Sequence, residues 1–236
     1  MSSAPGEPET GAVPEHAAPS PSRPAAPTAR YGLLLLLLIG TYLLTAFTTG
    51  RWIVATQIVV FVGAMLLALR NALIPQWIAR ILVVVVFIGS AVAFGLAVAQ
   101  PSTAAVGAAQ IWTGLILLAA AVMILRRVLA STTVTLQSIY GALSAYIIIG
   151  LMFAAFYAAM DRLGGVAFFA NGQPGDTKTF QYFSFTTLTT LGYGDFTAAG
   201  SLGRAVAVME AMFGQIFLAT LVARLVSAFR PSDPRK

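Results

Sequence analysis

The sequence predicts an all-α integral membrane protein, built from six transmembrane helices and one short re-entrant helix. Hydrophobic residues make up 58% of the 236 residues and charged residues only 9%. Soluble domains carry about 25% charged residues, so this chain has too few to cover a surface that faces water. The apolar residues also lie in long runs, and a short amphipathic stretch separates the last two runs.

The apolar runs set the expected helix boundaries. A bilayer core of about 30 Å needs roughly 20 helical residues. Inside it every backbone N–H and C=O needs a partner within the protein, which favours helices. The expected spans are 31–49, 52–69, 80–99, 108–125, 133–160 and 203–229.

The remaining composition excludes several classes of protein. The chain has no cysteine and one histidine, so disulfides and thiolate chemistry are excluded. No acid–base pair, nucleophile–base set or metal cluster is visible, and we expect neither an enzyme nor a bound cofactor. The formal charge of +6 comes from basic residues scattered at the ends of apolar runs, which does not favour nucleic acid as a partner.

The two ends of the chain are expected to be cytoplasmic. Residues 1–30 hold seven of the twelve prolines and predict a disordered tail, and residues 230–236 predict a second, short one. With the N-terminus inside, ten of the fourteen basic residues fall on the cytoplasmic side. This orientation predicts a multi-pass protein of the cell membrane, in contact with lipid.

The stretch before the last span carries the most specific motif. Residues 190–195 read Thr-Leu-Gly-Tyr-Gly-Asp. The glycines permit positive φ angles, so such a segment can hold a backbone whose carbonyls all point one way. A ring of such carbonyls can replace the water shell of a cation.

Together with an amphipathic segment before it and an apolar span on either side, this motif resembles the selectivity filter of potassium channels. The usual pattern has valine where this chain has Leu191. The resemblance implies a pore domain at 129–229, following a four-helix domain at 31–128. Its parts would be an outer helix (133–160), a turret (161–177), a pore helix (178–189), the filter (190–195) and an inner helix (203–229).

The resemblance also implies roles within the filter. The carbonyls of Thr190, Leu191, Gly192 and Tyr193, with the Thr190 hydroxyl, would bind dehydrated K⁺ as the permeant ion. Gly194 would let the chain turn outward. Asp195 would lie at the outer mouth, where negative charge concentrates cations.

Residues around the filter have expected supporting roles. Tyr182 and Phe183 would form an aromatic cuff around Tyr193, or else lie at the membrane interface. Thr186 stands where many bacterial relatives carry a glutamate that pairs with the aspartate of the motif. Asp176 is positioned to cap the pore helix.

Glu210 is the one acidic residue inside an expected span. An intramembrane carboxylate is a functional candidate. We expect it to accept hydrogen bonds from Thr186 and Thr187 and so support the filter, or alternatively to sense protons or attract ions.

The last span has a glycine at its middle and one stripe of residues along it. Gly214 matches the gating-hinge glycine of the resembled family, and it also suits close helix packing. Helical spacing places Gln215, Leu218, Val222 and Val226 on one stripe that would line the cavity and the gate.

The expected function is passive K⁺ conduction by a homotetramer, because each chain has one filter motif and a closed carbonyl ring needs four. The span 108–125 contains no charged residue, so steep voltage gating is not expected. The sequence leaves open an unknown regulatory partner. The alternatives are a weakly selective cation channel and a non-conducting transporter or scaffold.

Overall fold

The computed structural model describes residues 31–47, 61–66, 69, 76–99, 102–131 and 134–228. These residues are mostly helical, which confirms the all-α class. The helices are α1 (Tyr31–Phe47), α3 (Gln76–Ala99), α4 (Thr103–Ala130), α5 (Leu136–Leu163), α6 (Thr177–Leu188) and α7 (Ser201–Ala228). Residues 61–66 are also helical. An isolated antiparallel bridge joins Phe169 and Ala198.

The helix ends differ modestly from the expected ones. The helix expected at 108–125 is longer at both ends, and the helix expected at 133–160 begins and ends later. The span expected at 52–69 lies mostly outside the described residues, as do the tails at 1–30 and 230–236. Among the described helices, three are long and apolar enough to cross a membrane, namely α4, α5 and the Ser201–Ser227 part of α7.

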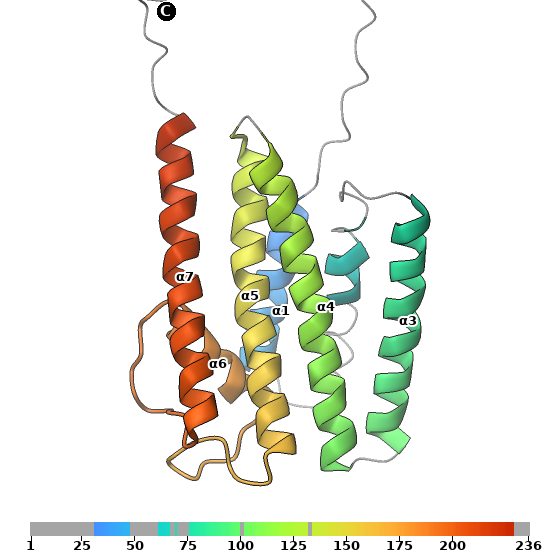
Figure 1. Ribbon diagram of the computed structural model, residues 1–236, viewed down its shortest axis with the longest axis vertical. Helices are drawn as coiled ribbons and strands as arrows, with labels where there is room; N and C mark the ends of the chain where they lie inside the picture. Colours follow the sequence, from blue (N-terminus) through green and yellow to red (C-terminus); the bar gives the residue numbers. More distant parts are fainter. Residues whose placement is uncertain are drawn as a thin grey trace, which may run out of the picture.

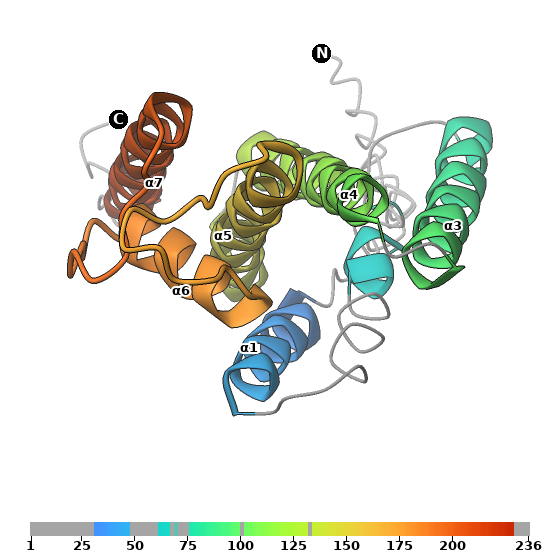
Figure 2. The same cartoon turned by 90° about the horizontal axis from the view of Figure 1, so that it is seen from below.

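The long helices stand side by side, and the short helix α6 lies against their lower half (Figure 1). α4 packs along α5, and α3 lies beyond α4 at one edge. α7 forms the opposite edge, and α6 contacts both α5 and α7. The view from below shows α1 beside α5 on the side of α6 (Figure 2). α5 is therefore the element against which the filter region is positioned.

Hydroxyl and carboxylate side chains define where three helices begin. Ser102 caps α4, Thr135 caps α5 and Asp176 caps α6, each accepting a hydrogen bond from a backbone N–H in the first turn. Such side chains satisfy donors that have no partner inside the helix. The expected capping role of Asp176 is confirmed.

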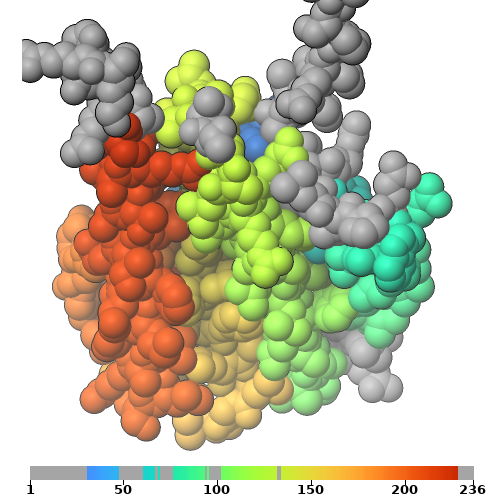
Figure 3. Space-filling model, turned by 45° about the horizontal axis from the view of Figure 1, so that its top comes forward, coloured from blue at the N-terminus to red at the C-terminus, as the bar shows by residue number. Residues whose placement is uncertain are grey.

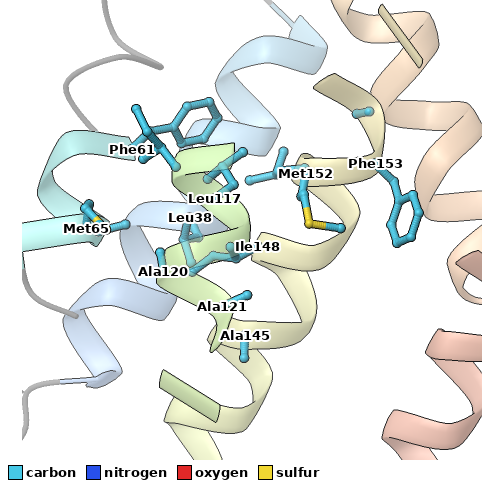
Figure 4. Packing of buried hydrophobic residues seen from close by; sticks show 14 of the residues in the cluster. Leu38, Phe61, Met65, Leu117, Ala120, Ala121, Ala145, Ile148, Met152 and Phe153 are labelled. Atoms are coloured by element: carbon cyan, nitrogen blue, oxygen red, sulfur yellow. The ribbon is translucent and has the colours of Figure 1, made fainter. Parts of the chain in front are cut away.

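The main apolar core joins α1, α4 and α5 (Figure 4). Leu38 of α1 lies with Leu117 and Ala120 of α4 and Ile148 of α5, and none of these side chains is exposed. Gly114 of α4 faces a ring of α5, which lies where a Cβ would stand. Small residues at helix contacts allow the close approach that drives packing in membranes.

α7 leaves much of its surface uncovered by the rest of the chain. The space-filling view shows it along one edge of the molecule (Figure 3). Its exposed large apolar side chains are Leu202, Val208, Met209, Met212, Phe213, Ile216, Val222 and Val226. This surface suits lipid or another protein chain rather than water.

Candidate functional site

The short helix α6 is held at its start and along one face. The Oδ1 atom of Asp176 accepts from the N–H of Thr179 at 2.8 Å and from its hydroxyl at 2.7 Å. Partial burial acts to raise the pKa of Asp176, but the hydrogen bonds from Thr179 and the charge of Lys178 outweigh it, so that the pKa lies below its ordinary value. Lys178 donates to the carbonyl of Ala46 at the end of α1, 3.4 Å away. The first turn of α6 is thus fixed to α1.

The chain turns sharply after α6 and directs its N–H groups back toward that helix. The N–H of Thr190 donates to the carbonyl of Thr187 at 2.9 Å. The N–H groups of Leu191 and Gly192 both donate to the carbonyl of Thr186, at 2.8 and 3.1 Å. Because C=O and N–H point in opposite directions across a trans peptide, the carbonyls of Thr190 and Leu191 point away from α6.

Alternate residues of this segment have positive φ angles. The values are 57° at Thr190, 51° at Gly192 and 81° at Gly194. Glycine adopts this region freely, whereas an L-residue with a side chain pays roughly 1–2 kcal/mol. The strained position is therefore Thr190, which the glycine pattern did not indicate.

Thr190 also contacts α7. Its hydroxyl donates to the carbonyl of Thr189 at 2.7 Å and accepts from the Nε2 atom of Gln215 at 3.1 Å. Gln215 was expected on the cavity stripe, and the structure places it at the start of the filter segment. Further along that stripe Leu218 is half-buried, while Val222 and Val226 are 56% and 63% exposed.

The outer end of the segment is held by the turret and by α6. The Tyr182 hydroxyl donates to Oδ2 of Asp195 at 2.9 Å. The Nδ2 group of Asn171 donates to the Asp195 carbonyl at 3.0 Å. The bridge at Phe169 adds a hydrogen bond from Ala170 to the carbonyl of Thr197, at 2.8 Å. Asp195 is thus bound at both its side chain and its backbone.

The two residues expected to form an aromatic cuff lie in different surroundings. Tyr182 lies near Asp195, and its ring packs edge-on against Phe196. Phe183 differs from the expectation, because it is buried among Tyr157, Phe168 and Phe169 with ring centroids 5.0 to 5.7 Å away. Tyr193 is 70% exposed in the single chain.

Glu210 is fully buried between three helices, and its partners differ from the expected ones. The Tyr157 hydroxyl of α5 lies 2.6 Å from Oε2, and the Ser184 hydroxyl of α6 lies 2.5 Å from Oε1. The Thr186 hydroxyl instead donates to a backbone carbonyl of its own helix. Sequence reasoning missed Ser184 and Tyr157. The one available signal was a serine between two phenylalanines on α6.

Gly214 lies where α7 crosses the end of α6. A Cβ at this position would overlap the carbonyl oxygen of Leu188, the last residue of α6. Tyr146 of α5 donates to the same carbonyl at 3.2 Å. Of the two interpretations of Gly214, the geometry supports close packing against the end of α6.

The far end of α7 is joined to the connection between α4 and α5. The Nη2 group of Arg224 donates to the carbonyl of Ser131 and to its hydroxyl, the latter at 3.1 Å. In the sequence, Arg224 is one of the ten basic residues expected on the cytoplasmic side. In the structure, Arg224 joins α7 to Ser131 at the C-terminal end of α4.

One family model matches this part of the chain. Residues 143–230 match the model described as an ion channel. The matched stretch runs from the second turn of α5 through α6, the filter segment and α7. No curated protein and no solved structure matches the chain. The match supports ion channel activity, and together with the three long apolar helices it supports a membrane protein whose residues 143–230 form an ion channel domain.

Proposed function

We propose that the chain is one subunit of a homotetrameric, K⁺-selective channel that conducts passively across the cell membrane. The observation that carries the proposal is the backbone of the filter segment. Three successive N–H groups, from Thr190 to Gly192, turn back to α6. The carbonyls of Thr190 and Leu191 are thereby directed away from α6, to the side where an ion can be bound.

The chemistry of this segment suits a dehydrated monovalent cation. Stacked rings of carbonyl oxygens replace the hydration shell of K⁺ without a fixed negative charge. The C-terminal end of α6 points the negative end of its dipole at the same region, which favours a cation there. Asp195 adds negative charge at the outer mouth. The Thr190 hydroxyl and the carbonyls of Thr190, Leu191, Gly192 and Tyr193 would bind the ion.

A tetramer would complete the site. One chain supplies one filter segment, and in that single chain Leu191 and Tyr193 remain 56% and 70% exposed. The exposed apolar surface of α7 offers an area for neighbouring subunits and for lipid. In this assembly the cavity stripe from Gln215 to Val226 would face the axis below the filter.

The gate would not respond steeply to voltage. A voltage sensor moves several charges across the membrane, each worth about 2.3 kcal/mol per 100 mV. α4 has no charged residue before Arg126 and Arg127, which lie near its C-terminal end. With the orientation that the positive-inside rule favours, that end and both termini would lie in the cytoplasm.

The test is single-channel recording from purified protein in a planar bilayer with opposed K⁺ and Na⁺ gradients. The expected reversal potential lies near the K⁺ equilibrium potential. A reversal near zero would indicate a weakly selective cation channel. Absence of current from intact tetramers would indicate a non-conducting scaffold or transporter.

Two glycine variants provide a matched pair. Gly192 and Gly172 both have positive φ, at 51° and 71°, and a Cβ on either would meet open space in the single chain. Gly172 lies in the turret, outside the filter segment. Gly192→Ala is therefore expected to abolish K⁺ selectivity, whereas Gly172→Ala, with similar backbone strain, is expected to retain it.

A further inference from the structure

Four groups from three helices form a continuous line of short contacts behind the filter. The Tyr157 hydroxyl lies 2.6 Å from one carboxyl oxygen of Glu210. The other carboxyl oxygen lies 2.5 Å from the Ser184 hydroxyl, and that hydroxyl lies 2.6 Å from the carbonyl oxygen of Gly150. Tyr157, Ser184 and Glu210 are each 0% exposed, so water does not reach these contacts.

The number of protons in this line is limited. A serine hydroxyl has one proton to donate, and a backbone carbonyl has none. Ser184 therefore donates either to Gly150 or to Glu210, but not to both. Two oxygens 2.6 Å apart with no proton between them repel each other. The short contact with Gly150 therefore assigns the Ser184 proton to that carbonyl.

The contact between Ser184 and Glu210 then needs a proton that comes from the carboxyl group of Glu210. With its own proton used, Ser184 can only accept from Oε1, which requires a protonated carboxyl group. Tyr157 donates to the remaining carboxyl oxygen, which accepts as the C=O of a carboxylic acid. A neutral acid also suits the site. In the part of the chain that the structure describes, the contacts of the Glu210 carboxyl group are with hydroxyl groups, and an ionised carboxylate without a cation beside it is costly in a buried environment.

We propose that Glu210 is a neutral carboxylic acid that donates its proton to Ser184. A directed chain of hydrogen bonds then runs from Tyr157 through Glu210 and Ser184 to the carbonyl of Gly150. The titratable groups that take part are Glu210 of α7 and Tyr157 of α5, while α6 contributes the hydroxyl of Ser184.

This chain makes Glu210 a positioning residue for the filter. It fixes α6 to α5 and α7 on the side away from the ion path. α6 in turn holds the N–H groups of the filter segment through the carbonyls of Thr186 and Thr187. Gly150 permits the approach, because the ring of Phe185 lies where its Cβ would stand. The effect on selectivity rests on the proposed function, but the protonation state does not.

The test is infrared difference spectroscopy of the full-length protein in lipid at neutral pH. The spectrum of Glu210→Gln is subtracted from that of the wild type, which isolates one of the eight acidic side chains. The expected difference is the loss of a C=O stretching band of a protonated acid, and this band should shift in deuterated water. Ser184→Ala and Tyr157→Phe should each move the band to higher frequency, since each removes one hydrogen bond to the acid.

Function provides a second readout on the same variants. In Glu210→Gln the amide can donate to Ser184 and accept from Tyr157, so the ratio of K⁺ to Na⁺ permeability should stay within about twofold of the wild type. Glu210→Ala leaves the buried Tyr157 hydroxyl without an acceptor and should reduce that ratio or the yield of tetramer about tenfold.

Loss of a carboxylate band, rather than an acid band, in Glu210→Gln would overturn the proposal. So would an acid band that does not respond to Ser184→Ala. If the wild type conducts without K⁺ selectivity but the acid band is present, the proposed function fails while the hydrogen-bond chain stands.

Discussion

The Tyr182 hydroxyl donates a hydrogen bond to the carboxylate of Asp195 across 2.9 Å. Tyr182 lies one helical turn before Thr186, the position where the resembled channels often place a glutamate. In this chain a phenol from the preceding turn of α6 binds the Asp195 carboxylate instead. Asp195 is thereby attached to the same helix that accepts hydrogen bonds from the N–H groups of Thr190, Leu191 and Gly192.

Removing this phenol should loosen the outer mouth. Tyr182→Phe keeps the ring contact with Phe196 and deletes only the hydrogen bond. The bond is solvent-exposed, so its loss should shift the ratio of conducting to non-conducting filters by about fivefold or less. The measurement is the decay of K⁺ current during a sustained recording. Tyr140→Phe is the control, because Tyr140 lies near the start of α5, the end of that helix away from the turret. Equal decay of the K⁺ current in both variants would refute the role of Tyr182.

A side chain at Gly214 should disrupt the filter support rather than stiffen a hinge. Gly214→Ala would bring a Cβ into the Leu188 carbonyl at the end of α6. Overpacking of this kind costs about 1–3 kcal/mol, so the thermal midpoint of the protein should fall and selectivity should decline. Gly40→Ala in α1 is the matched control, because a Cβ there meets nothing within 4 Å. A stable Gly214→Ala protein with normal selectivity and altered gating would support the hinge instead.

Loss of the Arg224 contact should favour the closed channel. Arg224 holds the end of α7 toward the α4–α5 connection, at the periphery of the proposed tetramer. Without it, Val222 and Val226 can approach the axis. We expect Arg224→Met to lower the open probability at least about tenfold, consistent with roughly 1.5 kcal/mol or more for a charge-assisted hydrogen bond. Ser131→Ala removes only the hydroxyl contact and keeps the backbone carbonyl, so its effect should be smaller. The reverse ranking in single-channel recordings would exclude this role.

The cap of α6 should stabilise the protein in a pH-dependent way. The pKa of Asp176 is lowered in the folded protein, where its carboxylate accepts hydrogen bonds from Thr179. Its stabilisation is therefore fully present above the ordinary pKa of an aspartate and is lost as the pH falls through the folded value. At neutral pH, Asp176→Ala should reduce the free energy of unfolding by about 1 kcal/mol.

Asp176→Asn separates capping from charge. Asparagine caps nearly as well as aspartate but does not titrate. Its stability should therefore vary less with pH than that of the wild type in denaturant titrations. A wild-type protein whose stability relative to Asp176→Asn stays constant across the acidic range would contradict the role assigned to the carboxylate.

The sequence predicted those features that depend on local patterns. Long apolar runs predicted the helices, and Asp176 predicted the start of α6, because capping depends on neighbouring residues. The glycines predicted the positive φ angles at 192 and 194. Thr190 was not foreseen, because its conformation is imposed by hydrogen bonds to α6 and not by its own preference.

Contacts between helices were harder to predict. α5 is apolar on all sides, so no periodic face indicated that Tyr157 would point at Glu210 or that Phe183 would join its cluster. Thr186 and Ser184 are both hydroxyl residues near the level of Glu210, and only the rotation of α6 decides which one faces it. Gly214 stayed ambiguous in sequence for the same reason, because its neighbour, Leu188, lies 26 residues away along the chain.

The left-handed Thr190 has a consequence for how the pore is kept intact. In the proposed tetramer four such residues surround one axis, and each conformational penalty of roughly 1–2 kcal/mol favours collapse of the carbonyl rings. An ion that binds only the intact rings offsets that penalty by mass action. In the proposed channel the permeant cation would thus act as a structural component, and resistance of the tetramer to heat should rise with K⁺ concentration.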